Sequence, residues 1–457
     1  MNKLQVKIRK NKGASREELL GLSQNELVER IMQLEAQTAQ LKNVISKSLS
    51  NNNSDTRRGN EPKRKFDFSK CNFRRIFLRV LYFGWNYQGL AVQEDSSQTI
   101  EHHLFHALTK SCLIENRETS NYHRCGRTDK GVSSFGQVMS ITVRSSFPPE
   151  KQFSEDSIRN EMAYCKILNR LLPKDIRVIS WMPIPYDRQD YSARFNCTKR
   201  QYKYYFPRSN LNVEAMRRAC SHLIGSHDFR HLCKMDVGNG VVKFTRDVFH
   251  ADIVGIDATS MMCFLIEGNA FLWHQIRCIM GVLILIGQGM ESPDIMRELL
   301  DVDKNTRKPQ YNMALGAPLN LFKCAYDIEY ENEWIYDKDE LKNVISQLQS
   351  EWTLESVNAL KHLLKCALLR IGTPCRRLYF RTATMIKDSF ETLQSKYMEM
   401  CANETKDVND SARDRDSIAS HADCLLQGVK SKVYKPLLKR ETCCKLCRVN
   451  LVLAVYT

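Results

Sequence analysis

The sequence contains no apolar run long enough to cross a lipid bilayer. Its longest apolar run extends from Cys278 to Ile286, whereas a membrane-spanning helix needs about 20 such residues. Residues 1–6 lack the apolar core of a secretory signal peptide, and there is no Lys-rich amphipathic helix or lipidation signal. We therefore expect a protein that is neither secreted nor held at a membrane.

Paired cysteine motifs are also missing, although cysteine itself is plentiful. The 17 cysteines are odd in number and scattered along the chain, which favours reduced thiols in the cytoplasm or nucleus over a disulfide framework. Cys443, Cys444 and Cys447 lie close together, but a structural zinc site would need a second ligand pair at matching spacing. Residues 238–240 are a lone turn-like stretch and do not form a dinucleotide-binding motif. No metal site is therefore expected.

Acidic residues are the minority among the charged side chains. Lys and Arg number 68 and Asp and Glu 52, which leaves a formal net charge of +16 and a pI near 9.1. Such a balance indicates a polyanionic partner, although a basic surface also serves plain solubility. The hydrophobic fraction of 43% is sufficient for a globular core.

Residues 1–49 are predicted to form a helical arm, and residues 50–70 a flexible basic linker. Within the arm, residues 15–49 carry the apolar seam of a coiled coil, formed by Leu20, Leu27, Ile31, Leu34, Leu41 and Ile45. The arm either binds a partner or packs back on its own domain, and the pattern does not choose between the two. The basic triplet at 63–65 is either a nuclear import signal or a solvated cluster.

Alternating strands and helices are predicted from about residue 73 to residue 330. The strands are Arg75–Phe83, Gln137–Val143, Gln201–Phe206 and Met261–Ile266, and the helices are Thr99–Ser111, Val213–Ile224, His274–Ile286 and Ser292–Leu300. The last helix is expected to have Ser292 at its N-cap and Pro293 at its first position. Two amphipathic helices, Asp337–Ala367 and Thr384–Met400, and a charged segment at 404–417 follow. This mixture favours an α+β fold over a doubly wound parallel sheet.

Asp129 lies in a short glycine-containing loop just ahead of a predicted strand. A carboxylate in such a loop is well placed to act as a nucleophile or base, because the scaffold holds it in position. Arg124, Arg127 and Lys130 could keep it ionised and also bind phosphates. From spacing alone, an ordinary turn in which Asp129 makes local hydrogen bonds is the favoured interpretation.

The segment from Tyr191 to Phe206 interleaves cations with aromatic rings. Its members are Arg194, Lys199, Arg200, Lys203, Tyr202, Tyr204 and Tyr205. Basic groups that grip a backbone and rings that stack on unpaired bases are typical of RNA binding. An aromatic strand in a protein core would show the same tyrosines.

Arg277 lies on the long apolar helix that His274 opens. A buried arginine needs a partner, because an unpaired buried cation is unfavourable. Asp129 is one candidate for that partner, and the alternative is a guanidinium that reaches the surface. His274 by itself is more typical of a packed or capping histidine than of a base.

Five ordered segments together resemble the TruA-type tRNA pseudouridine synthases. They are Gly126–Val132 with Gly136–Val138, Ala193–Phe195 with Arg200–Tyr204, His227–Phe229, Phe271–Arg277 with Gly281, and Ala317–Leu321. The resemblance covers about residues 75–330. Lys130, Ser133 and the segment 229–236 are similar to the eukaryotic branch, which modifies positions 38 and 39 in the anticodon arm.

The resemblance implies the pseudouridine synthase fold. This fold has two similar α+β halves, here 71–185 and 186–330, joined by a continuous, mostly antiparallel sheet with a central RNA-binding cleft. Residues 331–457 would form a helical and partly disordered extension. Family members act on tRNA as homodimers and need no cofactor or metal. The protein would then work in the cytoplasm and nucleus, with residues 15–49 as a possible coiled-coil contact.

The resemblance also implies an isomerase mechanism with named residues. Asp129 would be the catalytic carboxylate, acting on the sugar or base of a flipped uridine or abstracting a ribose proton. Arg277 would pair with Asp129, Tyr202 would stack on the uracil, and Arg127 would hold the flipped nucleotide.

Two other functions fit part of this pattern. A non-catalytic tRNA-binding or chaperone protein would share the basic and aromatic features without needing Asp129, Tyr202 and Arg277 together. A coiled-coil scaffold with a degenerate domain would depend on the arm at 15–49.

Overall fold

The computed structural model describes residues 66–234, 243–256, 261–330, 334–368, 376–401 and 437. Everything described below belongs to the compact unit that begins at Asp67. Several predictions lie outside the described residues and stay predictions: the arm at 15–49, the basic triplet at 63–65, residues 238–240, the charged segment at 404–417, and Cys443, Cys444 and Cys447.

The described strands form one nine-stranded sheet. Their bounds are Asn72–Tyr82 (β1), His123–Arg124 (β2), Ser133–Ser145 (β3), Ile176–Pro183 (β4), Cys197–Pro207 (β5), Gly225–Asp228 (β6), Thr245–Gly255 (β7), Met261–Gly268 (β8) and Leu319–Tyr326 (β9). The order is β4-β1-β3-β9-β5-β8-β7-β6, and β2 pairs with β3 at the side. The described pairings are antiparallel except at the centre, where β3 and β9 run parallel.

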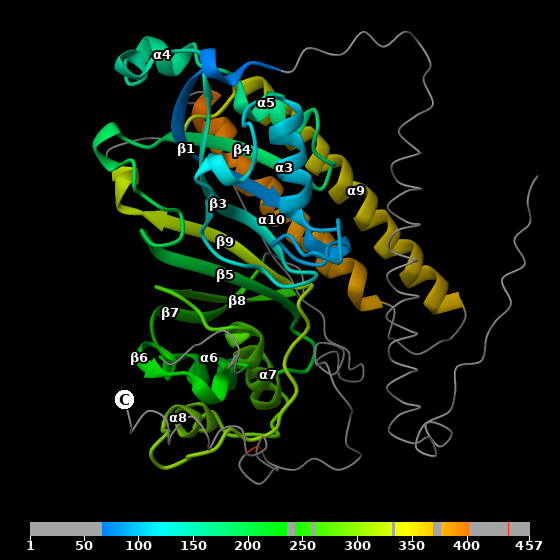
Figure 1. The fold of residues 1–457 in the computed structure, drawn as a ribbon. Helices are drawn as coiled ribbons and strands as arrows, with labels where there is room; N and C mark the ends of the chain where they lie inside the picture. The colour runs from blue at the N-terminus through cyan, green and yellow to red at the C-terminus, as the bar shows by residue number, and fades with distance from the viewer. Residues whose placement is uncertain are drawn as a thin grey trace, which may run out of the picture. The chain divides into compact units, whose positions relative to one another are not determined.

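Helices cover both faces of this sheet (Figure 1). Their bounds are Ile100–Lys110 (α3), Glu155–Arg159 (α4), Tyr164–Asn169 (α5), Val213–Ser221 (α6), Gln275–Gly287 (α7), Ile295–Leu300 (α8), Lys338–Leu368 (α9) and Arg376–Cys401 (α10). Helices α3 and α5 pack against β1, β3 and β4, and α6, α7 and α8 pack against β5, β7 and β8. Helices α9 and α10 pack against the opposite face. None of the described helices is long and apolar enough to span a membrane.

Alternation along the strands explains this layering, because successive side chains of a strand point to opposite faces. On β1, Val80 packs with α3 and α5, whereas Leu81 packs with α9 and α10. On β5, Tyr204 packs with α6, α7 and α8, whereas Tyr205 packs with α9 and α10. The ammonium of Lys203, also on β5, pairs with the carboxylate of Asp388 on α10. The C-terminal helices are therefore part of the folded unit that carries the sheet.

The predicted elements are confirmed in type, and β8, α3, α7 and α9 also agree within two residues at both ends. Strands β1, β3 and β5 begin three or four residues earlier than predicted, α6 ends three residues earlier, and α10 begins eight residues earlier. Helix α7 is buried along its whole length, as expected for a helix that is apolar on every side. The predicted start of α8 was wrong, because the helix begins at Ile295 with Asp294 at its N-cap. Ser292 instead accepts a hydrogen bond from the Asp294 amide within the preceding turn (3.3 Å), so serine and proline form the turn and not the first helical positions.

The parallel contact between β3 and β9 depends on a glycine. A Cβ atom at Gly136 would lie 2.4 Å from the carbonyl oxygen of Phe322 on β9. We expect Gly136→Ala to lower the free energy of unfolding by roughly 1–3 kcal/mol, measured by urea denaturation. Gly255→Ala is the matched control, since its Cβ would meet no described atom within 4 Å. Equal losses in both variants would contradict the prediction.

Candidate active site

Asp129 lies in the loop that joins β2 to β3, and backbone hydrogen bonds hold this loop against a neighbouring one. The amide of Leu90 donates to the carbonyl of Thr128 (3.1 Å), and the amide of Gly131 donates to the carbonyl of Tyr87 (3.2 Å). Gly131 has φ +78°, a left-handed conformation that favours glycine. The loop therefore holds Asp129 at a defined point just before β3.

Buried side chains support the loop from below. The hydroxyl of Tyr82 lies 2.8 Å from that of Thr128, and the side-chain amide of Gln137 donates to the carbonyl of Gly126 (2.9 Å). Thr128 is buried, whereas the carboxylate of Asp129 is 28% exposed. The loop thus directs the threonine into the core and leaves the carboxylate accessible.

Two basic side chains from the start of α7 approach the same oxygen of Asp129. The Nε2 atom of His274 lies 3.2 Å from Oδ2, and a terminal guanidinium nitrogen of Arg277 lies 3.8 Å from it. The Nε atom of Arg277 donates to the carbonyl of Ala314 (2.9 Å), which fixes the buried guanidinium. The buried guanidinium thus has a carboxylate and a backbone carbonyl as partners, as a buried cation requires.

His274 has an unusual backbone conformation for its position. It immediately precedes α7 with φ +60°, which is uncommon for a residue other than glycine. Its Nδ1 atom is buried and has no hydrogen-bond partner among the described residues. Strained backbone of this kind gathers at functional sites. With this backbone conformation, the imidazole of His274 lies beside the Asp129 carboxylate.

A basic cleft of about 540 Å³ opens beside the carboxylate. It is lined by Gln88, Gly89, Leu90, Ala91, Val92, Gln93, Glu101, Arg117, Arg124, Arg127, Thr128, Asp129 and Lys130. Arg127 and Lys130 are exposed. Four cations and two carboxylates line the cleft. The excess of positive charge attracts anionic ligands, so this cleft suits a phosphate-bearing ligand.

Glu101 on α3 organises one wall of this cleft. It is fully buried and pairs with the guanidinium groups of Arg124 and Arg117, and it accepts hydrogen bonds from the hydroxyl of Tyr122 (2.9 Å) and the amide of Val92 (3.1 Å). Burial alone would raise the pKa of Glu101, but the two guanidiniums and these hydrogen bonds hold that pKa below its usual value.

Tyr202 lies on β5 in the core rather than among the residues that line the cleft. Its side chain is only 8% exposed, and its ring packs edge-on against that of Phe271, with centroids 5.3 Å apart. Burial raises the pKa of Tyr202 well above its usual range, so the phenol is neutral. Its assignment as a stacking residue stays a prediction.

The structure therefore brings three of the four predicted site residues to one place and adds two others. Asp129 and Arg127 line the cleft, and Arg277 reaches Asp129 from α7. His274 was predicted as a packed or capping residue, and it does occupy the N-cap position of α7 with a side chain that is 9% exposed; its contact with Asp129 was not predicted. Glu101 gave no sequence signal, because its partners come from distant parts of the chain.

Comparison with known proteins assigns the family. A family model described as tRNA pseudouridine synthase matches residues 219–327. A tRNA pseudouridine(38/39) synthase from Bos taurus is 40% identical over 438 residues, which are 91% of this chain and 85% of the relative. The chain belongs to the tRNA pseudouridine synthase family.

Other members of this family differ in how much of the chain they match. The tRNA pseudouridine(38/39) synthase of Saccharomyces cerevisiae is 41% identical over 61% of this chain and 64% of its own length. A tRNA pseudouridine synthase A from Archaeoglobus fulgidus is 32% identical over 56% of this chain and 86% of its own length. The resemblance to the TruA-type synthases and their eukaryotic branch is thereby confirmed.

The buried carboxylate of Glu101 generates a stability prediction. We expect Glu101→Gln to lower the free energy of unfolding at pH 7 by roughly 1–3 kcal/mol, because the guanidiniums of Arg117 and Arg124 lose their anionic partner. Since the folded-state pKa of Glu101 is depressed, its stabilisation is present above the unfolded value near 4.5 and is lost as the pH falls through the folded value.

Urea unfolding of both proteins at pH 7 and at about pH 3.5 tests this prediction. The difference between wild type and Glu101→Gln should shrink at the lower pH. Glu155→Gln is the control, because the carboxylate of Glu155 is 90% exposed and its pair with Arg159 is at the surface. A difference that is independent of pH would argue against the assigned role of Glu101.

Proposed function

We propose that this protein converts uridine to pseudouridine at positions 38 and 39 of the tRNA anticodon arm. The observation that carries the proposal is the pair formed by Asp129 and the buried Arg277 beside a basic cleft. It occurs in a chain 40% identical to a tRNA pseudouridine(38/39) synthase over most of its length. The reaction is an isomerisation: the bond from the ribose to base nitrogen one breaks, a bond from the ribose to base carbon five forms, carbon five loses its proton, and nitrogen one gains a proton.

The carboxylate of Asp129 is the group that we assign to the reaction. Both His274 and Arg277 approach its Oδ2 atom, so Oδ1 is the oxygen that we assign to attack on the nucleotide or to proton abstraction. A uridine within a stem has to leave its stack to reach this atom, which costs a few kcal/mol. Arg277 and His274 act as positioning residues, because each holds the carboxylate rather than the base.

The cleft supplies the groups that would hold the nucleotide in its flipped position. Arg127 is exposed at the cleft, where a guanidinium can bind phosphate in bidentate geometry. Tyr202 is proposed to stack on the uracil. Since its ring is covered and packs against Phe271, this role requires that the ring become exposed when RNA binds.

The finer architecture is part of the same proposal. The strands of residues 71–185 (β1 to β4) lie on one side of the β3–β9 contact, and those of 186–330 (β5 to β9) lie on the other. This division supports two similar α+β halves. We further propose that the protein is a homodimer and that residues 15–49 make a coiled-coil contact. It would work in the cytoplasm and nucleus. Its net charge of +16 would favour binding of the polyanionic tRNA.

Replacement of the catalytic carboxylate is the decisive experiment. Asp129→Asn keeps the side-chain shape but removes the charge, so pseudouridine formation should fall by roughly 10³-fold or more. The measurement is primer extension on tRNA after pseudouridine-specific chemical modification. The control is Asp187→Asn, at an exposed position outside the cleft. Tight tRNA binding without modification by the wild-type protein would instead favour a non-catalytic tRNA-binding or chaperone role.

The positioning role of His274 gives a second prediction. His274→Ala should reduce the single-turnover rate by about 100-fold, because Asp129 loses one of the two groups that orient it, while tRNA affinity stays within a few-fold. His274→Asn retains a donor and tolerates the left-handed backbone, so it should recover part of the rate. Equal rates for wild type and His274→Ala would contradict the role.

A further inference from the structure

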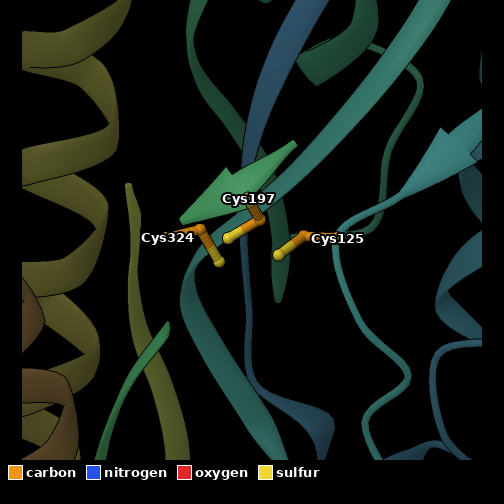
Figure 2. A group of neighbouring side chains, drawn as sticks. All are labelled: Cys125, Cys197 and Cys324. Carbon is orange, nitrogen blue, oxygen red and sulfur yellow. The ribbon is translucent and has the colours of Figure 1, made fainter. Parts of the chain in front are cut away.

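Three cysteine thiols meet in the core behind the catalytic loop. The Sγ atoms of Cys125, Cys197 and Cys324 all lie within 4.8 Å of one another, and Figure 2 shows the three side chains converging. Cys125 follows β2, Cys197 begins β5, and Cys324 lies on β9. Their exposed fractions are 2%, 9% and 1%. Three segments that are distant in the sequence therefore each place one thiol sulfur at the same buried site.

A guanidinium lies against this cluster. Arg200 donates to the backbone carbonyl of Cys125 (3.1 Å) and to that of Cys197 (3.5 Å). Its other printed partners are also backbone carbonyls, those of Arg194 and Asn269. Its positive charge is thus not matched by a carboxylate in these contacts. An anionic group in the cluster would supply the negative charge that offsets the guanidinium.

The strand register disfavours a disulfide between Cys197 and Cys324. Cys197 pairs with Tyr326, and Cys324 pairs with Arg200, so Cys197 and Cys324 are not opposite each other. Diagonal positions in an antiparallel pair have Cα atoms about 7–8 Å apart, beyond the roughly 4.4–6.8 Å that a disulfide needs. Three bonds of about 2.3 Å to one central ion would hold the sulfur atoms about 4 Å apart, which is compatible with their separation of at most 4.8 Å.

We propose that Cys125, Cys197 and Cys324 form a binding site for one soft monovalent metal ion of the Cu⁺ class. Thiolates select such ions, and three sulfur ligands complete a trigonal shell. Zinc in a structural site takes four protein ligands, and the described residues offer this cluster no fourth Cys, His, Asp or Glu. Three thiolates and Cu⁺ carry a net charge of −2, of which Arg200 offsets half.

The ion would join the catalytic loop to the strands beneath it. Cys125 directly precedes Gly126, the first residue of the loop that carries Asp129. The other two ligands lie on β5 and β9, the antiparallel pair next to β3. Ions that bind only the folded state stabilise it. Cu⁺ is therefore expected to raise the melting temperature and to protect the loop from hydrogen exchange.

The test is an anaerobic titration of the full chain with Cu⁺ in competition with a chromophoric chelator. The three C-terminal thiols, Cys443, Cys444 and Cys447, are replaced by serine in every protein compared, because closely spaced thiols also bind Cu⁺. This parent protein should take one equivalent of Cu⁺ from the chelator. X-ray absorption should then show a copper ion with three sulfur ligands.

Two substitutions separate the cluster from other buried cysteines. Cys324→Val in the parent should abolish both the capture of Cu⁺ and the rise in melting temperature. Cys263→Val should keep both, because Cys263 is equally buried on β8 but outside the cluster. If circular dichroism shows that Cys324→Val does not fold, Cys197→Ser, at the least buried of the three positions, takes its place with the same expected loss.

The contrary outcomes are equally distinct. Capture by Cys324→Val equal to that of the parent would overturn the proposal. So would a parent that captures no Cu⁺, or one that binds Zn²⁺ in a parallel titration but not Cu⁺.

Discussion

A guanidinium buried on an apolar helix has to be paired, and the candidate active site is built around that requirement. Helix α7 is covered along its whole length, and Arg277 is the residue on it whose charge cannot be left in the core without a partner. Asp129 and the carbonyl of Ala314 provide that partner. The helix therefore places a basic partner beside the loop that carries Asp129, and this contact orients the carboxylate.

The sheet supplies the framework that this pairing needs. The loop with Asp129 leads into β3, and α7 packs over β5 and β8, on the other side of the parallel contact between β3 and β9. Asn320 of β9 accepts a hydrogen bond from the amide of Phe135 on β3 (2.9 Å). The loop with Asp129 and the helix α7 are thus connected through one hydrogen-bonded sheet. Such a framework positions functional side chains more precisely than separate loops would.

The basic side chains at the cleft have two different environments. Glu101 uses Arg117 and Arg124 to build one wall, whereas Arg127 and Lys130 face the solvent. Cations held by a buried carboxylate are oriented, and exposed cations can bind phosphate. Basic side chains near Asp129 are therefore of two kinds: Arg117 and Arg124 are held by Glu101, and Arg127 and Lys130 are exposed to solvent.

The sequence by itself determined the element types and the family, and it singled out Asp129 as the candidate catalytic carboxylate. Period-two and helical patterns depend on local burial, so β1, β3, β5, α3 and α7 could be predicted from neighbouring residues. The motif around Asp129 carried the family. Contacts between distant segments carry no such local pattern. The approach of His274 to Asp129, the network of Glu101, the packing of α9 and α10 on the sheet and the meeting of Cys125, Cys197 and Cys324 were decided only by tertiary structure, because each depends on which strands become neighbours.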